Sequence, residues 1–261
     1  MRLLKPCLAF IFFILVNINQ TAAQTTETER PFRIGTGLGY SFNGYREETD
    51  IPLNRYLNVL NFNINCNLEI NNFYYSLNFG ILSGENNAVE IKNHENFFAY
   101  YQRESNFLRT YLENALDYRL WGNHVFPGYL GGAIRGDIYF SVLQESNYYS
   151  LTMLFSLNIH VTQKWIINKE NEFAFSVSLP VFGYGFRPPY FGLLYAPLDM
   201  EQRIISLHNY WAVFGDLKYH YQINKLFSFY LGLGFELSHI TFPQSRKDAL
   251  FRLNAGIAFS F

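Results

Sequence analysis

The chain has 261 residues and a formal net charge of −1, and 19% of its residues are aromatic whereas only 16% are charged. This charge balance gives no electrostatic support to a nucleic-acid partner. The aromatic content and a mean hydropathy of −0.05 are unusual for a water-soluble domain, but they suit a protein in which apolar and polar residues alternate along its strands.

The first residues have the pattern of a secretory signal peptide. Arg2 and Lys5 precede the unbroken apolar run Cys7–Val16, and the small residues Ala22 and Ala23 follow. A helix of that length covers about half of the hydrocarbon core, and no later segment approaches the roughly 20 apolar residues that a transmembrane helix needs. We therefore expect cleavage near residue 23 and a mature chain without transmembrane helices.

The expected division of the chain is a signal peptide over residues 1–23 and a single domain over residues 24–261. Cleavage removes two cations, which changes the formal net charge from −1 to −3. Cys66 is then the one cysteine of the mature chain, so no intramolecular disulfide can form. Because Cys66 alternates with apolar neighbours, we interpret it as a small apolar side chain.

Alternation of apolar and polar residues with period two indicates β-strands in most of the mature chain. Four asparagines occupy one face of the segment Leu60–Glu69. Asparagine is a poor strand former, so this face needs a polar surface to contact. Nine segments of about ten residues, the length of a tilted membrane-spanning strand, are predicted as strands: Phe32–Asn43, Leu60–Glu69, Phe73–Ile81, Leu130–Leu143, Leu151–Val161, Phe173–Val181, Trp211–Tyr221, Phe227–Leu237 and Ala249–Phe261.

The segment Phe107–Trp121 fits both a helical and a strand pattern, and periodicity does not choose between them. Single-chain bacterial barrels have an even number of strands, which favours a tenth strand here. Short connections are expected around Asn71, Asn123, Asn168 and Asn224, and longer ones at the opposite end. The sequence thus predicts an all-β, closed, antiparallel, up-and-down transmembrane β-barrel of about ten strands, with eight or twelve as alternatives.

The C-terminal sequence RLNAGIAFSF alternates apolar residues and ends in phenylalanine. In this it resembles outer-membrane β-barrel proteins of Gram-negative bacteria, whose last strand carries such a pattern. The resemblance implies an outer-membrane location among outer-membrane lipids, both termini in the periplasm, and recognition by the barrel-insertion machinery. The residues that match the insertion signal are Leu253, Ala255, Ile257, Phe259 and Phe261.

Charged residues on the polar faces are expected to pair inside the barrel. Folding the last hairpin about its loop sets Glu236 opposite Arg252, and folding the fourth about its turn sets Glu113 opposite Arg135. An unpaired charge at low dielectric is costly, so such pairs are the expected filling of a narrow barrel. With about ten strands we expect a largely plugged lumen, a monomer, and a structural, binding or narrow-transport role rather than a general porin.

An outer-membrane hydrolase is the alternative function. Hairpin register places His208 near Ser238 and His239 at the extracellular rim, with Glu236 one inward step below. A hydroxyl, two imidazoles and a carboxylate close together are the groups that nucleophilic catalysis uses. No local motif of outer-membrane proteases or lipases accompanies these residues. The leading interpretation is therefore a protein without catalysis, cofactor or metal, and a soluble periplasmic β-sandwich is the second alternative.

The segment Phe182–Pro197 is far more apolar than a solvated loop requires. Pro188 and Pro189 stiffen it, and aromatic and leucine side chains surround them. We expect this loop to fold inward as a lid or to lean on the outer leaflet. The alternative is a contact surface for a partner or a ligand.

Overall fold

A computed structural model describes residues 32–48, 53–86, 105–143, 148–187, 192–193, 201–241 and 245–261. The expected signal peptide therefore lies outside the described residues. So do the central parts of the long connections and most of the Phe182–Pro197 segment beyond Arg187, including the two prolines that we expect to stiffen it.

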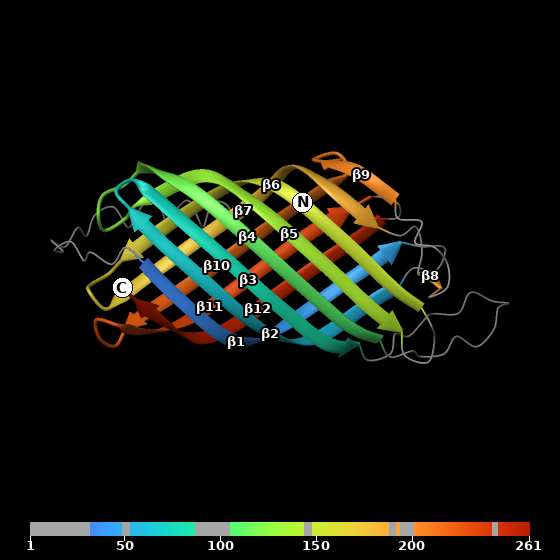
Figure 1. The fold of residues 1–261 in the computed structure, drawn as a ribbon, viewed down its shortest axis with the longest axis horizontal. Helices are drawn as coiled ribbons and strands as arrows, with labels where there is room; N and C mark the ends of the chain where they lie inside the picture. Colours follow the sequence, from blue (N-terminus) through green and yellow to red (C-terminus); the bar gives the residue numbers. More distant parts are fainter. Residues whose placement is uncertain are drawn as a thin grey trace, which may run out of the picture.

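A single antiparallel sheet closes on itself as a ten-strand barrel (Figure 1). In ring order its strands are β1 Phe32–Glu48, β2 Leu53–Ile70, β3 Phe73–Asn86, β4 Ser105–Trp121, β5 Gly128–Leu143, β6 Tyr148–Ile166, β7 Asn171–Arg187, β10 Tyr210–Gln222, β11 Phe227–Ile240 and β12 Ser245–Ser260. Two short strands, β8 Gly192–Leu193 and β9 Glu201–Ser206, extend the sheet beside β6 and β7.

Closure joins the first strand to the last over their full lengths. The register of β1 and β12 runs from Arg33 opposite Ser260 to Glu48 opposite Ser245, and the Phe261 amide donates to the Phe32 carbonyl at 2.9 Å. The predicted closed barrel is confirmed, and the two-sheet sandwich is excluded. The ambiguous segment Phe107–Trp121 is a strand, as the even-number argument predicts.

The pairing between β7 and β10 is interrupted within the described ranges. β7 pairs with β10 along 171–178 and with β9 along 182–187. Between these stretches lies Pro180, which has no amide to donate to a ladder, and the β6 register also shifts between Leu157 and Asn158. The barrel wall is therefore continuous here only because β9 replaces β10 as the partner of β7 beyond Pro180.

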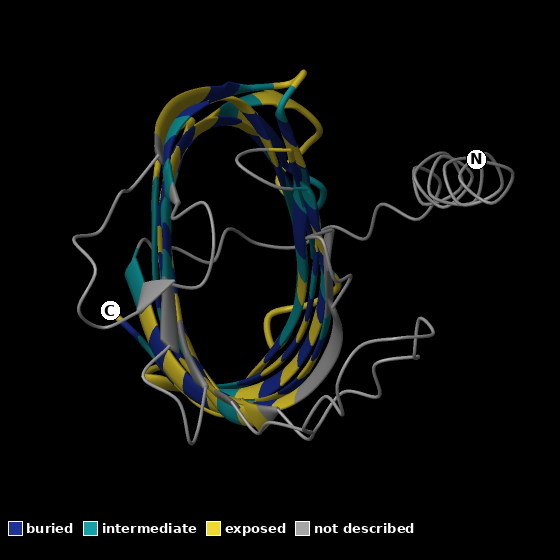
Figure 2. Cartoon of the chain, turned by 90° about the vertical axis from the view of Figure 1, so that its right-hand side faces the viewer, coloured by how far each residue is buried: buried dark blue, intermediate teal, exposed yellow. Residues whose placement is uncertain are grey.

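The two faces of the sheet differ in polarity. Leu38 and Leu60 are 69% and 71% exposed on the outer face, whereas their neighbours Asn61 and Ser41 are 5% and 0% exposed. Seen along its axis, the barrel is an elongated ring in which buried and exposed residues alternate along each strand (Figure 2). An apolar outer face and a polar inner face are what a membrane-spanning barrel requires.

The turns that join β2 to β3, β4 to β5, β6 to β7 and β10 to β11 lie at one end of the barrel, which we call the turn end, together with Phe32 and Phe261; the opposite end is the loop end. Asparagine side chains close these turns. Asn123 Oδ1 accepts bonds from the amides of residues 125 and 126, and Asn168 and Asn224 accept equivalent pairs. The connection around Asn168 is shorter than the expected strand bounds Leu151–Val161 and Phe173–Val181 imply, because β6 continues to Ile166 and β7 begins at Asn171.

Gly122 offers a test of the turn-end geometry. Its φ is +85°, and a Cβ there would lie 1.8 Å from the Phe126 carbonyl oxygen. We expect Gly122→Ala to lower the free energy of unfolding by at least about 1 kcal/mol, measured by urea unfolding in lipid vesicles. Gly132→Ala is the control, because its Cβ would meet nothing nearer than 3.7 Å; equal losses for both variants would contradict this geometry.

Candidate functional site: the filled lumen

A buried ion network occupies the lumen in the loop-end half. Arg109 Nη2 lies 2.6 Å from Asp137 Oδ1 and also bonds Glu236 Oε1. Arg135 contacts the same two carboxylates, with Nε 2.7 Å from Asp137 Oδ2 and Nη2 3.1 Å from Glu236 Oε2. All four residues are at most 2% exposed. The two guanidinium groups and the two carboxylates thus neutralise one another in buried surroundings.

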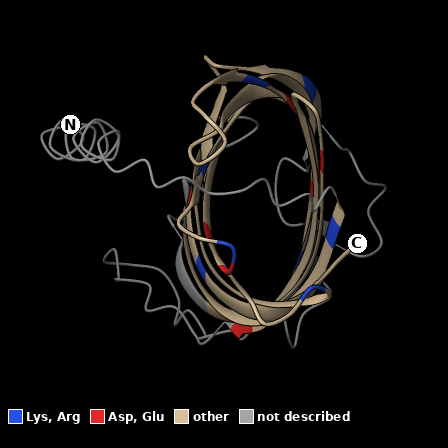
Figure 3. Cartoon of the chain, turned by 90° about the vertical axis from the view of Figure 1, so that its left-hand side faces the viewer, with Lys and Arg blue, Asp and Glu red and all other residues tan. Residues whose placement is uncertain are grey.

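This network connects opposite walls. Arg109 lies on β4 and Glu236 on β11, which stand half a ring apart in the strand order. Two other contacts cross the full width, Lys218 Nζ to Asn78 Oδ1 at 2.9 Å and the Arg246 guanidinium 4.9 Å from the centre of the Tyr139 ring. Figure 3 shows charged residues of both signs around the ring. The inner faces therefore touch across the lumen at three levels.

Aromatic rings hold the guanidinium groups in place. Arg135 lies 3.8 Å from the centre of the Phe214 ring and 4.8 Å from that of Tyr111, and Arg109 lies 4.3 Å from that of Tyr139. A cation over an aromatic face gains more when it is desolvated, as these are. The rings thus fill the space between the ion pairs and fix the side-chain positions.

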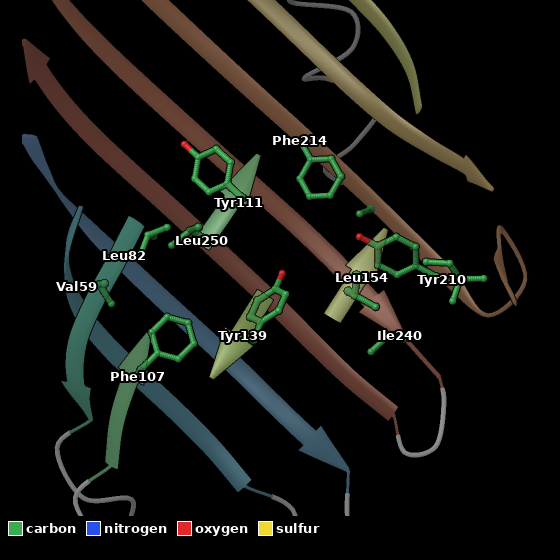
Figure 4. Packing of buried hydrophobic residues seen from close by; sticks show 12 residues of the cluster. Val59, Leu82, Phe107, Tyr111, Tyr139, Leu154, Tyr210, Phe214, Ile240 and Leu250 are labelled. Carbon is green, nitrogen blue, oxygen red and sulfur yellow. The ribbon is translucent and has the colours of Figure 1, made fainter. Parts of the chain in front are cut away.

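An apolar layer fills the lumen toward the loop end. Side chains from strands around the ring converge there (Figure 4). The layer consists of Val59, Leu82, Phe107, Tyr111, Tyr139, Leu154, Ile205, Tyr210, Ala212, Phe214, Ile240 and Leu250. Because it sits on the inner face, this layer excludes water from the loop-end side of the ion network.

The turn-end half of the lumen is polar. Arg33 Nη2 contacts Glu172 Oε2 at 3.0 Å, and Lys164 Nζ contacts Glu69 Oε2 at 2.6 Å. The Tyr129 hydroxyl also donates to Glu69. A cavity of about 80 Å³ lies beside these pairs and is lined by residues of β1, β2, β3, β6, β7 and β10.

The structure places the expected charge pairs as follows. Glu113 stands opposite Arg135, with Arg135 Nη1 3.6 Å from Glu113 Oε2. Glu236 does not stand opposite Arg252, because Ile240 pairs with Arg246 and the hairpin register differs by two residues from the expected one. Arg252 instead lies 3.5 Å from Asp216, and Glu236 contacts Arg109 of β4 and Arg135 of β5.

The candidate rim residues go to different partners. His208 lies in the turn after β9, where its Nδ1 is 2.6 Å from Ser206 Oγ. Ser238 points inward and donates to Asp248 over 3.5 Å. His239 is on the opposite face of the same strand, with its Nε2 3.1 Å from Ser245 Oγ. Glu236 is 0% exposed beneath them. The structure therefore does not bring the serine and the two imidazoles together.

Two groups of inner residues escape sequence reasoning. One is a buried contact in which His160 Nδ1 lies 2.7 Å from Asp117 Oδ2. The Thr162 hydroxyl donates to the same carboxylate oxygen. The other is the apolar layer, for which a signal exists: adjacent apolar residues near strand ends mean that both faces are apolar there. The doublets are Val59–Leu60, Ile81–Leu82, Phe107–Leu108, Ile204–Ile205 and Leu250–Phe251.

No helix within the described ranges is long and apolar enough to cross a membrane. Among the described side chains, no group of three or more histidine, cysteine, aspartate or glutamate residues could hold a metal ion.

Comparisons with known proteins place the fold. No family model and no curated protein sequence matches the chain. The crystal structure of the outer membrane protease OmpT from Escherichia coli matches with a TM-score of 0.58 at 9% identity, covering 93% of this chain and 99% of that one. The translocator domain of the autotransporter NalP from Neisseria meningitidis matches with a TM-score of 0.44 at 8% identity, covering 98% and 96%.

At 9% identity, the likeness to OmpT shows the shared fold alone. That fold agrees with the closed ten-strand ring and its apolar outer face. The chain therefore has the fold of the outer-membrane β-barrel proteins.

Proposed function

We propose that this protein is a monomeric, integral β-barrel of the bacterial outer membrane that serves as a structural or binding component and not as an open pore. The signal peptide expected over residues 1–23 delivers it across the inner membrane, and both termini face the periplasm. The C-terminal pattern ending in Phe261 then serves as its insertion signal.

The observation that carries this proposal is the contact between Arg109 and Glu236 across the lumen. Moving solute through this level would require separating these side chains, together with Arg135 and Asp137, in surroundings that exclude water. Removing one partner from such a buried pair costs several kcal/mol. The apolar layer on the loop-end side adds a second barrier to ions.

Conductance in planar lipid bilayers tests the proposal. We expect purified, folded protein to show no stable channel steps, and liposomes that contain it to retain small sugars and ions. Folding is checked first by the shift in gel mobility between unboiled and boiled samples. Reproducible open-channel steps from folded protein would contradict the plugged lumen and support a transport role instead.

A further inference from the structure

The cavity at the turn end has the size of a small-ligand site. Its volume of about 80 Å³ exceeds several times the roughly 10–15 Å³ that one water requires. The lining comes from six strands, and its charged members inside the barrel are Arg33, Glu69, Lys164, Glu172 and Lys218. The cavity lies on the turn-end side of the ion network.

The charges of this cavity do not balance. Glu172 is engaged by Arg33 and Glu69 by Lys164, so each carboxylate already has its cation. Lys218 donates to the neutral amide oxygen of Asn78 at 2.9 Å and forms none of the ion pairs found among the described residues. Its neighbour Asp216 pairs with Arg252. A desolvated ammonium that forms no direct ion pair with a carboxylate is costly unless an anion compensates it.

Two further nitrogen atoms in the cavity wall are buried without a hydrogen-bond partner. His220 is 3% exposed, and its Nδ1 has no partner. Arg33 Nε likewise has none, although the rest of that guanidinium is bound to Glu172. Arg33 Nε is an obligatory donor, and Nδ1 of a neutral imidazole can donate. In native proteins nearly all buried polar groups have a hydrogen-bond partner. We therefore expect acceptor atoms of a ligand beside these two nitrogen atoms.

We propose that the turn-end cavity binds one small oxyanion, a carboxylate or inorganic phosphate, held by Lys218, His220 and Arg33. An oxyanion supplies the negative charge that Lys218 lacks and several acceptor lone pairs for the two nitrogen atoms. The ligand enters from the turn end, because the ion network and the apolar layer close the other side. The site does not depend on whether the barrel conducts.

Calorimetric titration of the folded protein in a zwitterionic detergent tests this site, with acetate and inorganic phosphate as separate probes. We expect saturable binding of one anion per barrel for at least one probe. The probe with the smaller dissociation constant identifies the source, carboxylate or phosphate. Loss of one charge-assisted hydrogen bond weakens binding by about tenfold or more, which is the expected effect of Lys218→Met.

Lys225→Met is the matched control, because it removes the same charge from an exposed turn-end residue outside the cavity lining. It should bind the anion as the natural protein does. The anion should also raise the melting temperature of the natural protein and of the control but not of Lys218→Met. His220→Gln provides a second variant, with weaker binding expected, should Lys218→Met fail to refold. Absence of saturable binding by the natural protein, or equal weakening in both lysine variants, would overturn the proposal.

Discussion

Replacing Glu236 by alanine lowers the free energy of unfolding of the barrel by about 3–5 kcal/mol, the cost of breaking a buried ion pair by removing one partner. Glu236 is 0% exposed and contacts both Arg109 and Arg135. Its loss leaves two guanidinium groups to share Asp137 and the more distant Glu113. The measurement is urea unfolding in lipid vesicles, followed by tryptophan fluorescence and gel mobility.

Two comparisons separate this effect from a general charge effect. Glu85→Ala removes an exposed carboxylate near the loop end of β3, and we expect a change within about 0.5 kcal/mol. The double variant Arg109→Met/Glu236→Met replaces a pair by apolar side chains and should recover part of the stability. A loss below about 1 kcal/mol for Glu236→Ala would mean that water reaches the network.

Replacing Ile134 by arginine is expected to lower the free energy of unfolding in vesicles by about 2–4 kcal/mol, the cost of a charge at the bilayer midplane on the lipid face of a barrel. Ile134 lies on the outer face of β5 and is 61% exposed. On the surface of a water-soluble protein the same change would stay within about 0.5 kcal/mol. The size of the loss therefore reports the medium that this side chain contacts.

Ile223→Arg is the control for that measurement. Ile223 has nearly the same exposure, 62%, but it stands in the turn between β10 and β11, at the barrel end. We expect a loss of about 0–1 kcal/mol there. Losses of equal size at the two positions would contradict a membrane-spanning band that includes Ile134 and ends before Ile223.

Much of the architecture follows from local pattern. The alternation in Leu60–Glu69 predicts both the strand and the two sets of side chains on its faces, because period two fixes which residues share a face. The asparagines at the short connections mark the turns, where their side-chain oxygens accept hydrogen bonds from backbone amides. The even strand number resolves Phe107–Trp121, which its own periodicity leaves open.

The lumen is harder to predict, for two physical reasons. Hairpin register depends on loop conformation, and a shift of two residues preserves the faces but changes the partners. This is why Glu236 pairs across the lumen and not with Arg252. Contacts such as Arg109 to Glu236 also depend on how far the ring is flattened. The distance between opposite walls is set by all ten strands together, and no single segment of the sequence determines it.

We expect the outer face of the barrel to meet hydrocarbon. The most direct test of this contact is fluorescence quenching by lipids brominated in mid-chain. A probe is attached to the single cysteine of the Cys66→Ser/Ile134→Cys variant of residues 24–261, and to Cys66→Ser/Ile223→Cys of the same length for comparison. We predict strong quenching at residue 134 and weak quenching at residue 223. A probe at residue 134 that escapes the brominated chains and is quenched by aqueous iodide would contradict it.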